Sequence, residues 1–121
     1  MLDPQTVADR YIAVWNETDA KRRRALLAQS WTETATYADP LMQGRGSDEI
    51  DALIAGVQKR FPGFRFAISG LADGHGDHVR FSWQLAQDGA EAVVKGTDVV
   101  LIEGGRIAQV IGFLDQLPAA S

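Results

Sequence analysis

The sequence predicts an α+β fold, in which three N-terminal helices pack on a curved antiparallel sheet that forms a cone-shaped barrel. Two observations predict this fold. Up to residue 61, apolar residues recur every three or four positions, which is typical of helices with one buried face. After the Pro62-Gly63 pair, apolar and polar residues alternate, which is typical of strands with one buried face.

Composition limits the class of protein and its partners. Residues 1–121 are long enough for one domain with a core and a pocket. A net charge of −4 argues against binding to nucleic acid or to an acidic membrane, and the lack of cysteine excludes disulfides and thiolate zinc sites. Neither a signal peptide nor an apolar run of bilayer length is present in the sequence, so we expect a cytoplasmic protein without a membrane partner.

Three helices are predicted from their ends and their apolar stripes. Asp3 and Pro4 suit the start of the first helix, and Thr18 and Asp19 can cap a second that ends near Ser30. The third begins at Ser47 or Asp48 and ends at Pro62-Gly63. The residues of the predicted buried stripes are Val7, Tyr11 and Trp15, then Leu26 and Leu27, then Ile50, Leu53, Ile54, Val57 and Phe61.

Four consecutive basic residues, 21–24, lie in the second predicted helix. Four successive helical positions point in nearly all directions around the helix axis. We therefore expect this run to be a solvated surface and not an anion site.

Five strands are predicted, at 32–39, 64–69, 79–86, 94–103 and 106–115. Residues 70–78 are expected to form a loop, in which His75 and His78 belong to a surface turn and not to a metal site. The last hairpin has two possible registers. A two-residue Gly104-Gly105 loop places Ile111 and Phe113 beside Asp98, whereas a three-residue loop with a bulge at Gly105 places Val110, Gly112 and Leu114 there. The second register is preferred.

Asp98 is the only charged residue on its face of the 94–103 strand. Burying an unpaired charge is costly and usually raises the pKa of a carboxyl group instead. Gly96 and Gly112 suggest that the sheet bends so that its apolar face becomes concave. Asp98 is then expected inside a cavity whose predicted ligand-binding residues are Trp15, Trp31, Phe64, Phe66, Phe81, Trp83, Val100 and Leu114.

Four stretches of the chain resemble the nuclear transport factor 2-like superfamily, in its SnoaL-like polyketide cyclase and ketosteroid isomerase branches. They are Arg10-Tyr11-Ile12, the W-T-E-T-A-T-Y-A-D-P run at 31–40, the strand with Gly96, Thr97 and Asp98, and Gly105-Arg106-Ile107. The resemblance implies the curved α+β fold and a homodimer formed through the outer sheet face. Val99 and Leu101 on that face are consistent with such a contact.

The same resemblance implies three catalytic residues. Asp39 corresponds to the isomerase base, Tyr11 to its oxyanion-hole tyrosine, and Asp98 to its protonated aspartic acid. The implied function is general acid–base chemistry, of isomerase or cyclase type, on a mostly apolar carbonyl compound, without a cofactor or metal. The alternative is a non-catalytic ligand-binding or dimerisation module, in which Asp39 ends a strand and Tyr11 only packs in the core.

Overall fold

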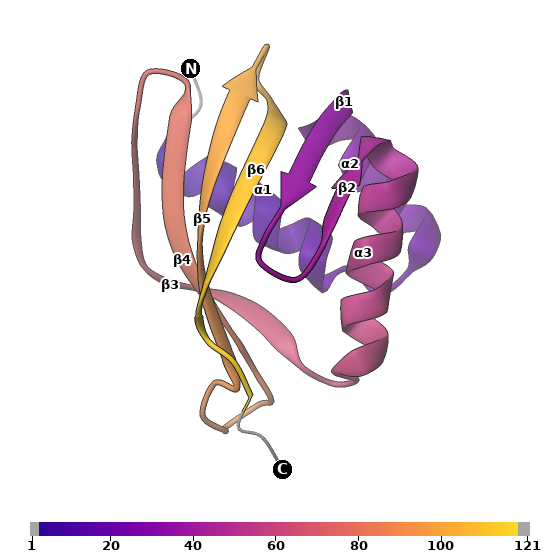
Figure 1. The fold of residues 1–121 in the computed structure, drawn as a ribbon, viewed down its shortest axis with the longest axis vertical. Coiled ribbons are helices and arrows are strands. Elements are labelled where there is room, and N and C mark those ends of the chain that lie inside the picture. The colour runs from indigo at the N-terminus through magenta and orange to yellow at the C-terminus, as the bar shows by residue number, and fades with distance from the viewer. Residues whose placement is uncertain (1–2, 119–121) are drawn as a thin grey trace.

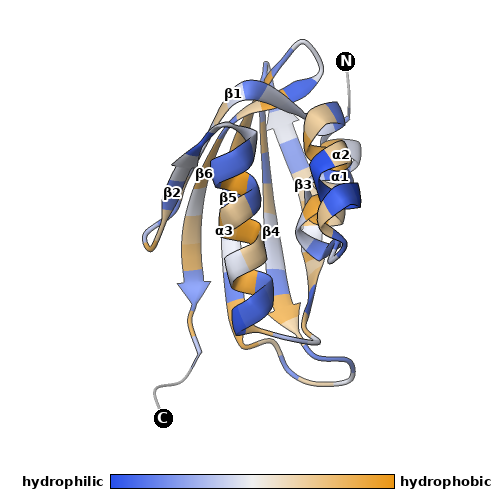
Figure 2. Cartoon of the chain, turned by 90° about the vertical axis from the view of Figure 1, so that its right-hand side faces the viewer, coloured by the Kyte–Doolittle hydropathy of each residue, from blue (hydrophilic) through white to orange (hydrophobic). Residues whose placement is uncertain are grey.

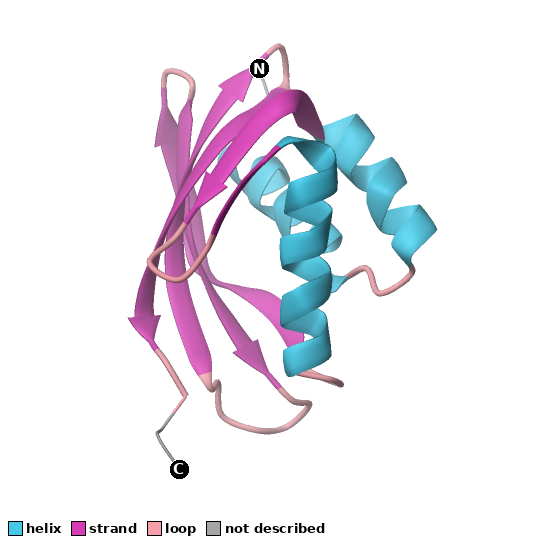
Figure 3. Cartoon of the chain, turned by 45° about the vertical axis from the view of Figure 1, so that its right-hand side comes forward, coloured by secondary structure: helices cyan, strands magenta, loops and turns pink. Residues whose placement is uncertain are grey.

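The computed structural model describes residues 3–118, which form a layer of three helices on one face of a six-stranded sheet (Figures 1 and 3). The helices are α1 (Pro4–Asn16), α2 (Ala20–Ser30) and α3 (Gly46–Arg60). The strands are β1 (Trp31–Ala38), β2 (Gln43–Arg45), β3 (Arg65–His75), β4 (His78–Ala86), β5 (Val94–Glu103) and β6 (Arg106–Gln116). The predicted α+β class with three helices is confirmed, and α3 follows β1 and β2 in the chain.

The sheet is curved and open, and its strands run in the order β2-β1-β6-β5-β4-β3. We predicted a wholly antiparallel sheet, and this is wrong for one pair, because β1 and β6 are parallel. The helix α3 and the rest of the chain separate these two strands in sequence, which provides the long connection that parallel neighbours require. In the described residues 3–118, no helix is both long and apolar enough to cross a bilayer.

The predicted N-cap at Asp3 is confirmed, and of Thr18 and Asp19 it is Asp19 that caps α2. The Asp3 side chain accepts a hydrogen bond from the Thr6 amide at 2.8 Å, and the Asp19 side chain accepts one from the Arg22 amide at 2.9 Å. Each cap satisfies a backbone donor that the helix itself leaves free. The third helix starts at Gly46, immediately before the predicted Ser47.

The β3–β4 hairpin is longer than predicted. Residues 70–75, expected in a loop, continue β3, and His75 pairs with His78 across a two-residue turn. The register is irregular between Ser69 and Asp73, and Gly70 has φ of +80°. A positive φ is easy only for glycine, so the Gly-rich composition that suggested a loop instead marks a bulge inside a strand.

The β5–β6 hairpin combines features of both registers considered above. Val110, Gly112 and Leu114 pair with Val100, Asp98 and Gly96, as preferred. The loop, however, has two residues, since Glu103 pairs with Arg106. The extra residue is Ala108, which is skipped in the pairing, so the bulge lies in β6 and not in the turn.

The core lies between the helices and the concave face of the sheet, where apolar residues gather (Figure 2). Its fully buried members include Val14, Leu27, Ile50, Ile54, Val100 and Val110. On the opposite face of the sheet, Ile111 and Phe113 are 37% and 55% exposed. The homodimer through this face stays a prediction.

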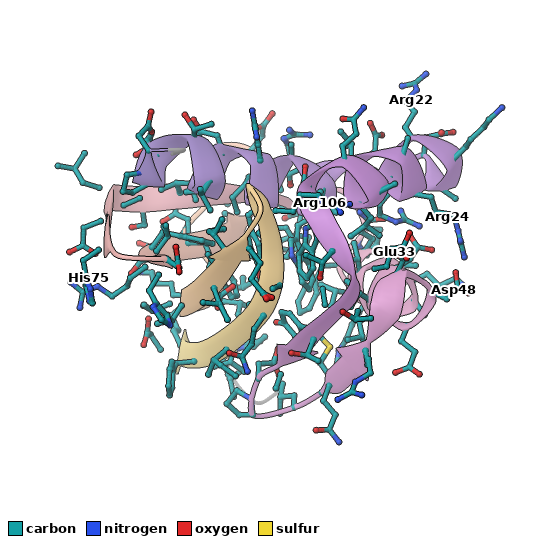
Figure 4. All side chains as sticks on the ribbon, turned by 90° about the horizontal axis from the view of Figure 1, so that it is seen from above. Arg22, Arg24, Glu33, Asp48, His75 and Arg106 are labelled. Atoms are coloured by element: carbon teal, nitrogen blue, oxygen red, sulfur yellow. The ribbon has the colours of Figure 1, made fainter. Side chains whose placement is uncertain are left out.

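We predicted that the basic run at 21–24 is a solvated surface, and this is wrong for one of its four residues. Arg22 and Arg24 point outward (Figure 4), but Arg23 is only 4% exposed. The Arg23 guanidinium donates to Asp51 of α3 at 2.6 Å, to the Glu17 carbonyl at 3.0 Å and to Gln58 at 2.9 Å. The burial of Arg23 could not be predicted from the sequence, because its partner Asp51 lies 28 positions further along the chain.

Replacing Arg23 with Ala should lower the free energy of unfolding by about 3 kcal/mol, because the buried Asp51 loses its nearer cation and keeps only Arg24 at 3.7 Å. Arg22→Ala is the matched control on the same helix, and it should change stability by about 0.5 kcal/mol or less. Urea unfolding followed by tryptophan fluorescence measures both. Equal effects of the two variants would contradict the buried ion pair.

Candidate active site

A cavity of about 260 Å³ lies between α3 and the concave face of the sheet. Most of its lining is apolar, and the ionisable side chains in it are Tyr11, Tyr37, Asp39 and Arg60. The remaining lining residues are Trp15, Leu41, Met42, Val57, Phe61, Phe66, Trp83, Leu85, Val94, Leu114, Leu117 and Pro118. An apolar hollow with a few polar groups is the usual form of a small-molecule site.

At the buried end of the cavity, Tyr11 of α1 and Asp98 of β5 form a hydrogen bond. The Tyr11 hydroxyl lies 2.5 Å from Asp98 Oδ2, and the two residues are 3% and 1% exposed. Tyr11 stacks on Trp31 with ring centroids 5.9 Å apart and contacts Phe81 at 4.9 Å. These rings hold the phenol in place, so the bond has little freedom to move.

Asp98 fits into the sheet because its neighbour across the hairpin is Gly112. A Cβ atom at position 112 would lie 2.8 Å from Asp98 Oδ1 and 3.3 Å from the Cβ of Asp39, closer than the neighbouring groups allow without shifting. Gly96 plays the same part for Trp83, whose ring occupies the space of the missing side chain. The two glycines thus allow the Asp98 carboxyl group and the Trp83 ring to pack closely against the backbone of the neighbouring strand.

Burial changes the acidity of both members of the pair. Removal from water raises the pKa of Asp98 from 3.8 to about 6, and the nearby carboxylate of Asp39 adds to this rise, while the bond from Tyr11 opposes it. Burial, together with the charge of Asp98, also raises the pKa of Tyr11 well above 10.0. The phenol therefore stays protonated at neutral pH, and the carboxyl group changes its protonation near neutrality.

A second pair lies on the β1 side of the cavity. The Tyr37 hydroxyl donates to Asp39 Oδ2 at 2.7 Å, and Asp39 Oδ1 accepts from the amides of Leu41 and Met42 at 2.7 and 3.0 Å. Pro40 follows Asp39, so these amides come from the turn that leads into β2. Burial raises the pKa of Tyr37, as do the charge of Asp98 and the bond to Asp39.

The structure brings some of the predicted site residues together and places others apart. Tyr11 and Asp39 line the cavity, whereas Asp98 is not among the lining residues and lies behind Tyr11. Of the predicted ligand-binding residues, Trp15, Phe66, Trp83 and Leu114 line it. Trp31, Phe81 and Val100 are buried in the core beyond it, and Phe64 lines a separate hollow of about 40 Å³. Their roles stay predictions.

This arrangement is suited to proton transfer. It offers a phenol with a buried acid behind it and a carboxylate in the same cavity, which are groups that donate and accept protons. Among residues 3–118, no cluster of three or more His, Cys, Asp or Glu side chains is placed to hold a metal ion.

Comparison with known proteins identifies the family. Residues 8–110 match the SnoaL-like domain family. A crystal structure of a SnoaL-like protein from Agrobacterium tumefaciens, named as a candidate isomerase, is 48% identical in sequence. The match covers 95% of this chain and 99% of that one, with a TM-score of 0.90. The chain belongs to the SnoaL-like family. Among curated proteins, none matches it.

More distant structures share the fold of this SnoaL-like domain. A candidate ketosteroid isomerase from Kribbella flavida is 15% identical with a TM-score of 0.69, and the match covers 96% of this chain and 80% of that one. A candidate SnoaL-like polyketide cyclase from Jannaschia is 13% identical with a TM-score of 0.71, covering 95% and 89%. At these identities the likeness shows the nuclear transport factor 2-like fold alone.

Several residues that line the cavity of the SnoaL-like domain were not among the site residues predicted from the sequence. Tyr37 of β1 lies two positions before Asp39, which follows the strand directly, so the period of two predicts that both side chains point the same way. Val57 and Phe61 belong to the predicted stripe of α3, and Arg60 lies three positions after Val57 on the same face. No local signal marks Leu117 or Pro118, which reach the cavity only through the course of β6.

Replacing Asp98 with Asn should stabilise the SnoaL-like domain at alkaline pH. The pKa of Asp98 is raised in the folded state from 3.8 to about 6, so folding favours its protonated form. The wild type therefore loses stability as pH rises through this window, and the Asn variant does not. The free energy of unfolding of the variant, relative to that of the wild type, should therefore be about 2 kcal/mol higher at about pH 8 than at about pH 4.5.

Urea unfolding at the two pH values measures this difference. Asp88→Asn is the control, because Asp88 is exposed in the turn before β5 and should give no such change. A pH-independent difference between Asp98→Asn and wild type would contradict the raised pKa.

Proposed function

We propose that this SnoaL-like domain is an enzyme that moves a proton next to the carbonyl group of a mostly apolar small molecule, in an isomerase- or cyclase-type reaction. The observation that carries the proposal is the Tyr11–Asp98 hydrogen bond of 2.5 Å at the buried end of an apolar cavity that Asp39 also lines. The family, with its isomerase- and cyclase-named relatives, supports it. The scheme uses only side chains of this chain.

Asp39 is the proposed base. Its Oδ1 atom accepts two backbone amides and is fully engaged, whereas Oδ2 accepts one bond, from Tyr37. A carboxylate oxygen has two lone-pair positions, so Oδ2 retains one for a proton from a carbon atom in the cavity. The two amides and the phenol fix the orientation of that lone pair, which places the base without a change in structure on binding.

Tyr11 is the proposed donor to the carbonyl oxygen. As this oxygen gains negative charge, a hydrogen bond from a fixed phenol in an apolar site stabilises it. The Tyr11 hydroxyl can donate to a substrate only when it does not donate to Asp98. When Asp98 is protonated, its own O–H donates to the Tyr11 oxygen, and the Tyr11 O–H turns to the substrate.

Asp98 is thus a positioning residue that acts through Tyr11. Its burial raises its pKa to about 6, so that the protonated form is accessible near neutral pH. The expected reactive state has Asp98 and Tyr11 protonated and Asp39 ionised. Deprotonation of Asp98 reverses the hydrogen bond and withdraws the donor from the cavity.

Exchange of protons for deuterium next to the carbonyl group tests the proposal without knowledge of the natural substrate. A panel of apolar cyclic ketones and unsaturated ketones in D2O is followed by proton NMR. The wild type should accelerate exchange in at least one of them, and Asp39→Asn should slow it by about a hundredfold or more. Binding of the same ketone, read from the fluorescence of Trp15 and Trp83 in the lining, should be unchanged.

Asp88→Asn serves as the control for loss of a carboxylate that is not part of the cavity lining, and it should exchange as the wild type does. If Asp39→Asn exchanges as fast as wild type, Asp39 is not the base. If it loses binding and exchange to the same extent, the residue shapes the pocket and the catalytic proposal fails.

A further inference from the structure

The only cation in the cavity lining that the structure describes belongs to Arg60. Arg60 lies in the last turn of α3, which is hydrophilic in Figure 2. Val57 and Phe61 also line the cavity, and the three residues share one helix face because they are spaced by three and four positions. Lys59, next to Arg60, faces elsewhere and is not among the lining residues.

Exposure distinguishes the two ends of the cavity. Tyr11 and Trp15 are 3% and 4% exposed, so they form its buried end. Leu41 and Leu117 are 69% and 51% exposed, and Arg60 is also exposed, so these residues form its mouth. Two large apolar side chains left in water beside the mouth favour an apolar occupant that extends to the surface.

The Arg60 guanidinium has no salt bridge and no side-chain hydrogen bond within residues 3–118. By contrast, Arg23, Arg24 and Arg80 each pair with an aspartate. The other charged group of the lining, Asp39, is already bonded to three donors of its own. The donors of Arg60 are therefore available to a ligand at the mouth.

We propose that the ligands of this pocket are amphipathic acids, with an apolar body in the cavity, the carbonyl group at the Tyr11 end and an anionic group held by Arg60 at the mouth. This inference rests on the proposed function, for which it names the substrate class. A planar guanidinium suits a carboxylate because it can donate two parallel hydrogen bonds. The protein as a whole carries a net charge of −4, so a preference for anions has to arise locally.

Two probes of equal shape test the inference, naphthylacetate and its uncharged amide, naphthylacetamide. Their dissociation constants are measured by tryptophan fluorescence and by calorimetry at low salt. Wild type should bind the acid about fivefold more tightly than the amide. Arg60→Gln should bind both equally, with the affinity for the amide unchanged. Lys59→Gln, which removes a neighbouring charge outside the lining, should retain the preference.

Salt provides a second measurement, because it should weaken binding of the acid and leave the amide unaffected. Equal binding of both probes by wild type, or a preference that survives in Arg60→Gln, would overturn the role of Arg60 and leave the proposed function standing. If neither probe binds, the cavity is not a ligand pocket, and the proposed function also fails.

Discussion

The hydrogen bond between Tyr11 and Asp98 determines how the rest of the site is arranged. Its partners are 87 positions apart, so α1, which packs on β3 and β4, must lie where the Tyr11 side chain can reach β5. Tyr11 achieves this from the buried stripe of α1, among Trp31 and Phe81. A carboxyl group removed from water would otherwise be costly, and its bond to a phenol offsets part of that cost.

The sheet is adapted to this acid at two glycines. Gly112 leaves room for the Asp98 carboxyl group, and Gly96 leaves room for the Trp83 ring. The space that Gly112 leaves open borders the Asp98 carboxyl group and also the Cβ atom of Asp39, so both aspartates of the proposed site lie beside this one position. Their mutual repulsion contributes to the raised pKa of Asp98. The same backbone feature therefore shapes the cavity and sets the chemistry of its buried end.

Much of the fold could be predicted from the sequence, because caps and periodicity are local signals. The caps at Asp3 and Asp19 depend only on residues a few positions away. Features that depend on distant partners could not be predicted. Arg23 is buried because Asp51 lies opposite, and Asp98 lies behind Tyr11 because of how α1 crosses the sheet. The preferred pairing of β5 with β6 was predicted with a bulge at Gly105, but the bulge lies at Ala108, because the residues of a turn do not by themselves determine the register of its strands.

The proposed site depends on Asp98 being a buried carboxyl group that is hydrogen-bonded to Tyr11 and gains or loses its proton near neutral pH. A titration of the Asp98 side-chain carbonyl carbon by NMR, in protein labelled with 13C at aspartate, tests it most directly. The account predicts a midpoint at about 6, and a higher midpoint in Tyr11→Phe, because the phenol stabilises the carboxylate. A midpoint near the ordinary value of 3.8, unchanged in Tyr11→Phe, would contradict it.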